Sequence, residues 1–418
     1  MNTIHLTLVK WKLTCAFMVW DKAKKYRLLK MVEFEREMIE KFICFFKQET
    51  VLCAAVLLAL LSMLLVWPDA EYIAYIDFRT LAILFCLMGV MAGLKNSGVF
   101  QWVAQKLLGK VRKVWQLVLS LVLLCFFSSM LLTNDVALIT FVPFTFIILG
   151  LIGRKAQKRL LIPIVVLQTI AANLGSMLTP IGNPQNLYLY GKSGISLASF
   201  LLLMLPYVLF AFLIIIVWSL LQARIYKAKL TISISGKTAI SGTPVQLLVY
   251  ALLFGLDLLT VARVLPYQLT LGLTILGLLL VDREAFRRVD YSLLLTFVGF
   301  FIFIGNVGRL PAFHQLLQQL VVGHELLAAV LASQIISNVP AALLLSGFTE
   351  NYTALLIGVN LGGLGTLIAS MASLISYKLL VREDSRLKGR YFRYFTLANL
   401  CFLGFLLLFA FVLSLEIW

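Results

Sequence analysis

The sequence predicts an all-α polytopic membrane protein that is an inverted repeat, with two re-entrant helical hairpins and two broken transmembrane helices. First, 61% of the 418 residues are hydrophobic, only 13% are charged, and the mean hydropathy is +0.97. Many apolar runs reach the length that spans a bilayer. Second, one pattern of polar residues and glycines occurs twice. Third, the positions of Lys and Arg assign opposite orientations to the two copies.

The repeated stretch is 171–190, AANLGSMLTPIGNPQNLYLY, which recurs at 358–377 as GVNLGGLGTLIASMASLISY. Four pairs align at a constant separation of 187 positions: Asn173 with Asn360, Gly175 with Gly362, Thr179 with Thr366, and Tyr190 with Tyr377. Gly and Pro disfavour a continuous helix, and irregular backbone survives at membrane depth only where it is buried in protein or lines a cavity. We therefore expect a binding site where two broken helices, 160–190 and 353–380, are interrupted.

A polar triplet interrupts an apolar run ahead of each copy: Thr133-Asn134-Asp135 and Ser337-Asn338-Val339. The first triplet lies in 114–152, which basic residues flank on both sides, so this segment begins and ends on the inner face. It forms either two full spans joined outside or a re-entrant hairpin, and the lack of a separate loop favours the hairpin. The second triplet lies in 324–351, flanked by Glu325 and Glu350 without Lys or Arg. This pattern predicts a hairpin that enters from outside.

In chain order, we expect a basic leader, a first repeat, a polar linker and a second, inverted repeat: residues 1–48, 49–223, 224–243 and 244–418. Further spans are expected near 50–67, 79–94, 199–221, 245–261, 267–281, 290–306 and 394–418. The leader has no clear signal-peptide core or cleavage site, so we expect a cytoplasmic or interfacial amphipathic helix. The charge rule places the N-terminus in the cytoplasm and the C-terminus outside the plasma (inner) membrane.

The net charge of +17 does not predict nucleic-acid binding, because the basic residues lie in short loops between apolar runs. The six cysteines form no CxxC pair, and most lie in apolar segments. We therefore expect reduced packing residues, no disulfide, no metal site and no cofactor beyond a Na⁺ coupling ion. Membrane lipid and a small anion are the expected partners.

Where a helix is broken, the ends of the two half-helices present unpaired backbone groups that can bind ions. A helix N-terminus presents free N–H groups and a partial positive charge, which suit an anion. Free carbonyls at opposing C-terminal ends, together with Thr and Asn oxygens, suit a bare Na⁺. Two hairpin tips facing two broken spans would therefore hold one small anion and up to two coupling cations.

Three segments carry a family resemblance: FSSMLLTNDVALITFVP, ANLGSMLTPIGNPQNL and SQIISNVPAALLLSGF. They resemble the ion transporter superfamily, which includes divalent anion/sodium symporters, citrate transporters, arsenite permeases and sodium/proton antiporters. The resemblance covers about residues 50–418. It implies a homodimer, because relatives of this fold tend to be dimeric.

The resemblance also implies site residues. Substrate contacts are expected at Thr133, Asn134, Asp135, Thr179, Pro180, Asn183, Ser337, Asn338 and Thr366. Coupling-ion contacts are expected at Thr133, Asn134, Asp135, Gly175, Asn183, Ser337, Asn338, Gly362 and Ser370. In the dicarboxylate branch each tip reads Ser-Asn-Thr, so Asp135 and Val339 depart from that pattern. Asp135 puts a negative charge near the anion site and fits a cation ligand or a proton carrier.

The leading hypothesis is a secondary transporter that moves a small anion with Na⁺ or H⁺ by alternating access. A sodium/proton antiporter and an arsenite efflux permease are the nearest alternatives. An intramembrane enzyme is disfavoured, because His324-Glu325 lacks the second His of an HExxH motif and no GxSxG occurs. A passive channel is also disfavoured, since nothing in the repeat requires a continuous pore. Asp257 lies inside a predicted span and is a further functional suspect.

Overall fold

The structure is a computed structural model that describes residues 36, 38, 49–109, 111–224 and 240–417. Almost all of the predicted leader and most of the predicted linker lie outside the described residues. The chain divides into two compact units, residues 1–54 and 55–418. In the first unit the described residues are Arg36, Met38 and 49–54, and they include the beginning of helix α2 (Thr50–Leu65). The second unit is described below.

All regular secondary structure elements of the described residues are helices, and these residues form no strands. Eight helices are long and apolar enough to cross a membrane, by length and composition. They are α4 (Phe78–Asn96), α6 (Val114–Leu131), α7 (Asn134–Ile152), α8 (Arg154–Ser176), α10 (Leu197–Ala223), α11 (Pro244–Val261), α13 (Tyr291–Gly308) and α19 (Lys388–Ile417). The prediction of an all-α polytopic membrane protein is therefore confirmed. The inverted orientation of the two repeats and the re-entrant course of the hairpins stay predictions.

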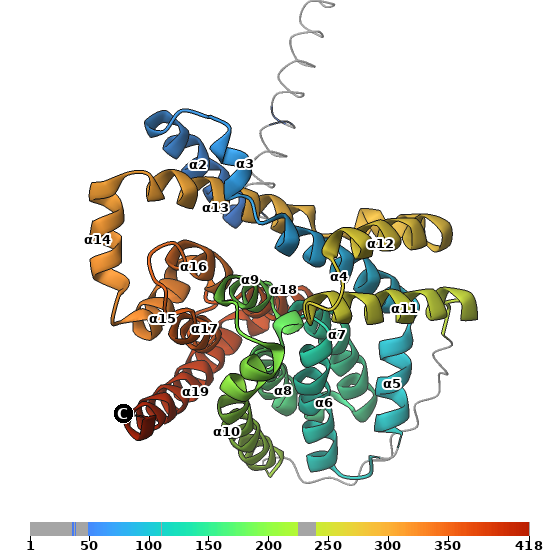
Figure 1. The fold of residues 1–418 in the computed structure, drawn as a ribbon. Helices are drawn as coiled ribbons and strands as arrows, with labels where there is room; N and C mark the ends of the chain where they lie inside the picture. The colour runs from blue at the N-terminus through green and yellow to red at the C-terminus, as the bar shows by residue number, and fades with distance from the viewer. Residues whose placement is uncertain (1–35, 37, 39–48, 110, 225–239, 418) are drawn as a thin grey trace, which may run out of the picture. The chain divides into compact units, whose positions relative to one another are not determined.

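Both polar triplets lie where two helices meet. Helix α6 ends and α7 begins around Thr133, whose hydroxyl accepts a hydrogen bond from the Val136 amide (3.4 Å) as an N-cap. Helices α15 (Glu325–Ile336) and α16 (Asn338–Leu345) meet at Ser337, which has a φ of 75°. The second pair is much shorter, 12 and 8 residues against 18 and 19. Figure 1 shows the two pairs as separate groups of helices.

Both expected breaks interrupt a helix. Helix α8 ends at Ser176, a 3₁₀ turn covers Pro180–Gly182, and α9 runs over Pro184–Ser193. The turn requires glycine at position 182, because a Cβ there would lie 2.0 Å from the Ser176 carbonyl oxygen. The second break separates α17 (Tyr352–Leu361) from α18 (Met371–Glu383). Helix α8 itself begins at Arg154, before the expected start at 160, and continues through Pro163.

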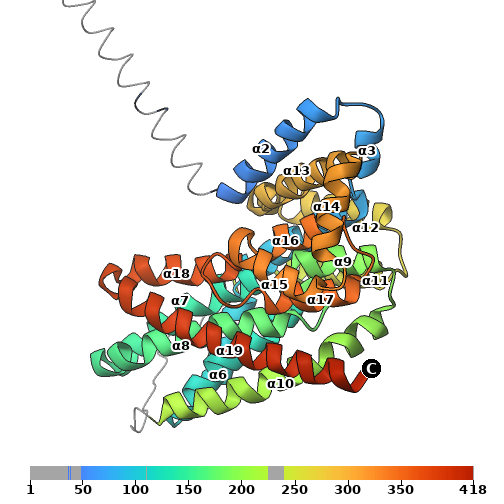
Figure 2. The ribbon, with the colours of Figure 1, turned by 90° about the vertical axis from the view of Figure 1, so that its left-hand side faces the viewer.

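Two groups of helices position the site. Helices α6, α7 and α8 pack together and also contact α10 or α18. Helices α4, α11 and α12 (Tyr267–Val281) form a second cluster, labelled at the right of Figure 1. In Figure 2, α10 and α19 run side by side. Three shorter α-helices and two 3₁₀ helices complete the described chain: α3 (Glu71–Tyr75), α5 (Val99–Leu108), α14 (Pro311–Val321), η2 (Arg283–Arg288) and η3 (Ser385–Leu387). Helices α5 and α14 are amphipathic, as expected of helices at a membrane surface.

Candidate transport site

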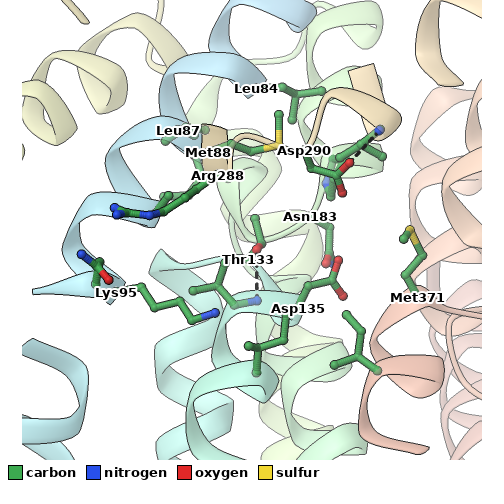
Figure 3. Close-up of a pocket in the computed structure, with 18 of the residues that line it drawn as sticks. Leu84, Leu87, Met88, Lys95, Thr133, Asp135, Asn183, Arg288, Asp290 and Met371 are labelled. Carbon is green, nitrogen blue, oxygen red and sulfur yellow. Dashed lines mark hydrogen bonds between the residues drawn. The ribbon is translucent and has the colours of Figure 1, made fainter. Parts of the chain in front are cut away.

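A cavity of about 670 Å³ opens beside the first polar triplet. Thr133 and Asp135 line it from the tip between α6 and α7, and Asn183 lines it from the first break. Helix α4 lines the cavity with apolar side chains and with Lys95, and the approach to α13 lines it with Arg288 and Asp290. Figure 3 shows these side chains around a common space, with Asp135 and Asn183 pointing toward one another. The volume fits a small molecule.

Two oxygen atoms on this wall lack partners. The Oδ1 atoms of Asp135 and Asn183 are buried, and neither has a hydrogen-bond donor among the described residues. The Asn183 amide nitrogen is already used, because it donates to the Ser176 hydroxyl at 2.7 Å. The free side of this amide therefore presents an acceptor. A carboxylate and an amide oxygen, both without donors, are suited to a bound cation or proton rather than to an anion.

Two basic side chains, Lys95 and Arg288, line the same cavity, and only Lys95 forms no ion pair with the described residues. Arg288 is engaged by Asp282 at 3.2 Å and by Glu284 at 2.7 Å. Lys95 makes no hydrogen bond or ion pair with the described residues, and it is partly buried. Asp290 N-caps α13 through the Leu293 amide (2.9 Å). Lys95 is thus the cation best placed to attract an anion into the cavity.

Asn134 lies behind the cavity wall instead of lining it. It is buried, and its amide nitrogen donates to the Asn173 side-chain oxygen at 3.0 Å. Asn173 in turn donates to the Ser370 hydroxyl (3.1 Å) and to the Gly363 carbonyl (3.4 Å), both in the second break. A buried amide chain therefore links the first hairpin tip to the second break.

The second half of the chain makes a matching link in the other direction. Asn360, which aligns with Asn173, donates to the Asn186 side-chain oxygen at 2.7 Å, just past the first break. Each broken helix thus hydrogen-bonds the break of the other. Asn173, Asn186 and Asn360 were not among the predicted site residues. The alignment of Asn173 with Asn360 in the repeat is the sequence feature that marks two of these residues.

The threonines of the two breaks have equivalent contacts. Thr179 donates from its hydroxyl to the Met130 carbonyl, and Thr366 donates to the Gln334 carbonyl at 3.1 Å. Met130 and Gln334 each stand three residues before a hairpin tip. These hydroxyls satisfy a free carbonyl at the end of the first hairpin helix. Thr179 and Thr366 are therefore engaged within the protein, as is Pro180, which is buried in the 3₁₀ turn.

The two glycines that align across the repeat mark close helix contacts. A Cβ at Gly175 would lie 2.1 Å from the Phe126 carbonyl oxygen, and one at Gly362 would lie 2.7 Å from the Ser333 hydroxyl. Both contacts press a broken helix onto the first helix of the neighbouring hairpin. Glycine is needed at both positions for this approach.

The second polar triplet is closed off in this structure. Ser337 and Asn338 are 3% and 4% exposed, and the backbone N–H of Asn338 donates to the Ala369 carbonyl at 2.9 Å. Neither residue lines the cavity beside the first tip. The structure therefore brings Thr133, Asp135 and Asn183 to one cavity. It places Asn134 and Ser370 in the buried amide chain, and it keeps Ser337 and Asn338 apart from that cavity.

Known proteins place the chain in a family. Residues 38–352 match the family described as citrate transporter. An uncharacterized transporter of Methanocaldococcus jannaschii is 34% identical over 322 residues, which cover 77% of this chain and 86% of that protein. The inner membrane protein YbiR of Escherichia coli is 32% identical over 343 residues, covering 78% and 85%. The silicon efflux transporter LSI3 of Oryza sativa subsp. japonica is 34% identical over 133 residues, covering 32% and 26%.

These matches agree with the resemblance drawn from the sequence motifs, and they point to a transporter instead of an enzyme. The family match spans the first hairpin, the first break and the second hairpin. The cavity lies at the first of these hairpins. The chain is therefore a membrane transporter that belongs to the citrate transporter family.

Proposed function

We propose that this protein is a secondary active transporter of a small carboxylate or inorganic oxyanion, coupled to Na⁺ or H⁺ and working by alternating access. The observation that carries the proposal is the pair of unpartnered oxygens on Asp135 and Asn183 in a cavity that Lys95 also lines. The two oxygens are suited to a cation, and the charge of Lys95 is suited to an anion.

The anion would bind between Lys95 and the N-terminus of α7. The first amides of α7 carry the partial positive charge of a helix start, and Thr133 adds a hydroxyl at the same place. Lys95 provides the full positive charge from α4, and its reach into the cavity can be followed in Figure 3. These groups recognise a negatively charged oxygen without fixing which anion carries it.

Asp135 supplies a physical reason for coupling. An anion about 4 Å from an ionised carboxylate is repelled by about 4 kcal/mol at an effective dielectric constant of about 20. That repulsion weakens anion binding by about a thousandfold. A Na⁺ or H⁺ on Asp135 removes it, with the Asn183 oxygen as a second ligand. The cation therefore binds first or together with the anion, which couples anion binding to the cation gradient.

Alternating access is supported by the unequal state of the two tips. The first tip lies open to the cavity, on the side that carries Lys95 and Arg288, whereas the second tip is buried. By the positive-inside rule the open side is cytoplasmic. We therefore assign this structure to an inward-open form, and we expect an outward-open form to expose Ser337 and Asn338 instead. We expect the protein in the inner membrane as a homodimer.

A sodium/proton antiporter is the second candidate, and Asp135 is the observation that favours it. In that case Na⁺ and H⁺ would compete for the carboxylate, and Lys95 would have no anion to bind. An efflux permease for an oxyanion such as arsenite would use the same cavity in the outward direction.

Flux in proteoliposomes decides between these functions. The purified protein would be given labelled di- and tricarboxylates, sulfate, phosphate and arsenite under an imposed Na⁺ gradient, and then under a pH gradient. Uphill uptake of one anion, driven by one of the gradients, is the expected result. Proton movement on addition of Na⁺, with no anion flux, would establish the antiporter. Downhill anion flux that ignores both gradients would contradict secondary active transport.

A further inference from the structure

A second group of polar side chains lies inside the cluster of α4, α11 and α12, outside the cavity lining. The apolar core of this cluster includes one residue from each helix: Val90, Leu253 and Leu278. Residues four positions apart lie on the same face of a helix, one turn away. One turn from these three residues the chain carries Cys86, Asp257 and Thr274. A polar layer therefore lies next to the apolar one.

The direction of the helices places the three polar residues at the same level. Helices α4 and α11 are antiparallel, because Arg79 at the start of α4 donates to the Thr260 carbonyl at 3.3 Å, near the end of α11. At the other end, the ring of Tyr250 lies within 2.4 Å of the position of a Cβ on Gly93. A short turn joins α11 to α12, so α12 runs parallel to α4.

The burial of the three residues agrees with this layer. Cys86 and Asp257 are each 1% exposed, and Thr274 is fully buried. All three side chains are therefore enclosed by the same three helices.

The oxygens of this layer have no partners. Both Asp257 carboxylate oxygens and the Thr274 hydroxyl lack a hydrogen bond among the described residues. An ionised carboxylate without a counter-charge is costly inside a protein and more so inside a membrane. A group with no structural partner and such a cost is an ion-binding suspect.

No cation from the neighbouring helices faces Asp257. On α4, Arg79 is engaged by the Thr260 carbonyl and Lys95 lies at the opposite end, on the cavity. The remaining titratable group of α4 is the Cys86 thiol, and α12 contributes only Tyr267, at its first position. The charge of Asp257 therefore has to be removed by a ligand that comes from outside the cluster.

We propose that Asp257 is a proton-binding site, separate from the cavity at the first hairpin tip. A proton fits better than Na⁺, because the layer offers one carboxylate and one hydroxyl, whereas hard cations take about six oxygen ligands. A proton from water adds to a carboxylate oxygen, and the side chain becomes neutral.

Two further threonines give the proton a path to Asp257, and its binding affects the helix that lines the cavity. Thr260 and Thr270, whose hydroxyls bond one another, lie about one turn from Asp257 and Thr274 toward the α11–α12 turn. The side of α4 away from this layer lines the cavity with Leu84, Leu87 and Met88. Charging Asp257 would loosen the packing behind that cavity wall. A role of the proton in transport rests on the proposed function, whereas its binding does not.

The test is infrared spectroscopy of the full-length protein in liposomes, comparing the wild type with Asp257→Asn over the pH range in which both stay folded. We expect the wild type to show the C=O stretching band of a protonated carboxyl, which shifts in D₂O and is absent from Asp257→Asn. The band should fade as the pH rises. Asp135→Asn, at the cavity, should retain it.

A pair of variants at Thr274 tests whether the hydroxyl of the same polar layer influences the proton on Asp257, without altering the carboxyl. Thr274→Val removes the hydroxyl at nearly constant volume and should move the midpoint of the band to a different pH, whereas Thr274→Ser should keep it. No protonated band at any pH would overturn the proposal. So would a band that never titrates, or one that Na⁺ abolishes at constant pH. Because no anion is needed, the result stands apart from the proteoliposome flux.

Discussion

At the scale of single residues, the site depends on which polar atoms are left without partners. Most polar side chains around the breaks are engaged: Thr179, Thr366 and Asn134 all make hydrogen bonds within the protein. Asp135 and Asn183 keep one free oxygen each at the cavity. A free buried acceptor is destabilising unless a ligand satisfies it. We therefore propose these two free oxygens at the cavity, more than the hydrogen-bonded motif residues, as the ligand contacts.

Asp135→Asn should separate anion binding from cation coupling. The substitution removes the negative charge that repels the anion, so anion binding should no longer require Na⁺ or H⁺. We expect uphill transport to be lost and anion affinity in the absence of the coupling cation to rise at least tenfold. Gradient-driven uptake and binding calorimetry would measure the two effects. Anion binding that still depends on the cation in Asp135→Asn would contradict the proposed role.

Lys95→Gln should weaken anion binding, because it removes the free positive charge of the cavity while keeping a polar side chain of similar length. A hydrogen bond to a charged group contributes about 1.5–3 kcal/mol, so we expect a loss of affinity of about tenfold to a hundredfold. Lys95→Arg is the control, since it retains the charge. Equal affinity in Lys95→Gln and the wild type would remove Lys95 from the site.

At the scale of the helices, close backbone contacts and hydrogen bonds between the two broken helices fix the positions of the breaks. Asn173 reaches the second break and Asn360 reaches the first, so neither broken helix is positioned by its own repeat alone. Substitution of either residue would leave the other amide chain intact. The arrangement links the two breaks through hydrogen bonds.

Gly182→Ala should disrupt the first break. The new Cβ would lie 2.0 Å from the Ser176 carbonyl oxygen, so the 3₁₀ turn has to move. Overpacking of this kind typically costs about 1–3 kcal/mol, and we expect a lower melting temperature together with a loss of transport. Gly150→Ala is the matched control, because nothing lies within 4 Å of its new Cβ and α7 is helical there. A melting temperature in Gly182→Ala equal to that of Gly150→Ala would contradict the steric argument.

The pair of Asp69 and Arg309 ties the loop before α3 to the end of α13, outside the spans. Arg309 donates to Asp69 at 2.7 Å, and this hydrogen bond holds the pKa of Asp69 below its usual value. A lowered pKa stabilises the folded state above the pKa of the unfolded carboxyl, and this gain is lost as the pH falls through the folded pKa.

Arg309→Ala should therefore lower stability slightly at neutral pH and have no effect once Asp69 is protonated. The difference should also shrink with added salt, because the pair is solvent-exposed. Thermal unfolding at two pH values would measure it. Glu71→Gln is the comparison, since that carboxylate lies further from Arg309, at 3.6 Å, and should matter less. A pH-independent effect of Arg309→Ala would indicate packing instead of charge.

At the scale of the whole molecule, the two hairpin tips differ in access. Thr133 lines the cavity, whereas Ser337 is buried against the second break. Two copies of one pattern are thus in different states within a single structure. Such an asymmetry is expected of a transporter whose two repeats open to opposite faces in turn.

Single cysteines at 133 and 337, in a background without the native cysteines, should report this asymmetry. We expect an impermeant thiol reagent to label position 133 from the inner face, and position 337 only from the outer face and only when the outward form is populated. Mass spectrometry after one-sided labelling of oriented vesicles would measure it. Both positions reacting from the same face would contradict the inverted orientation of the hairpins.

The sequence by itself determined the class of the protein. Apolar runs of bilayer length give membrane helices wherever they occur, because every backbone group must be satisfied within lipid. The same local reasoning located the first break, since Gly182 and Pro184 disfavour a helix through their own geometry, and the repeat then located the second. Thr133, Asp135 and Asn183 could be proposed for the same reason, as polar residues at interruptions of apolar segments.

Only the tertiary structure decided which polar atoms remain free. Asn134 and Asn183 are alike in the sequence, yet Asn134 is bonded to Asn173 while Asn183 faces the cavity with an unused oxygen. The roles proposed for Lys95 and Asp257 depend on helices that are distant in the chain. Lys95 lines a cavity with Asp135, and both carboxylate oxygens of Asp257 lack a partner among the described residues. Whether a polar atom has a partner depends on three-dimensional packing, which no local pattern specifies.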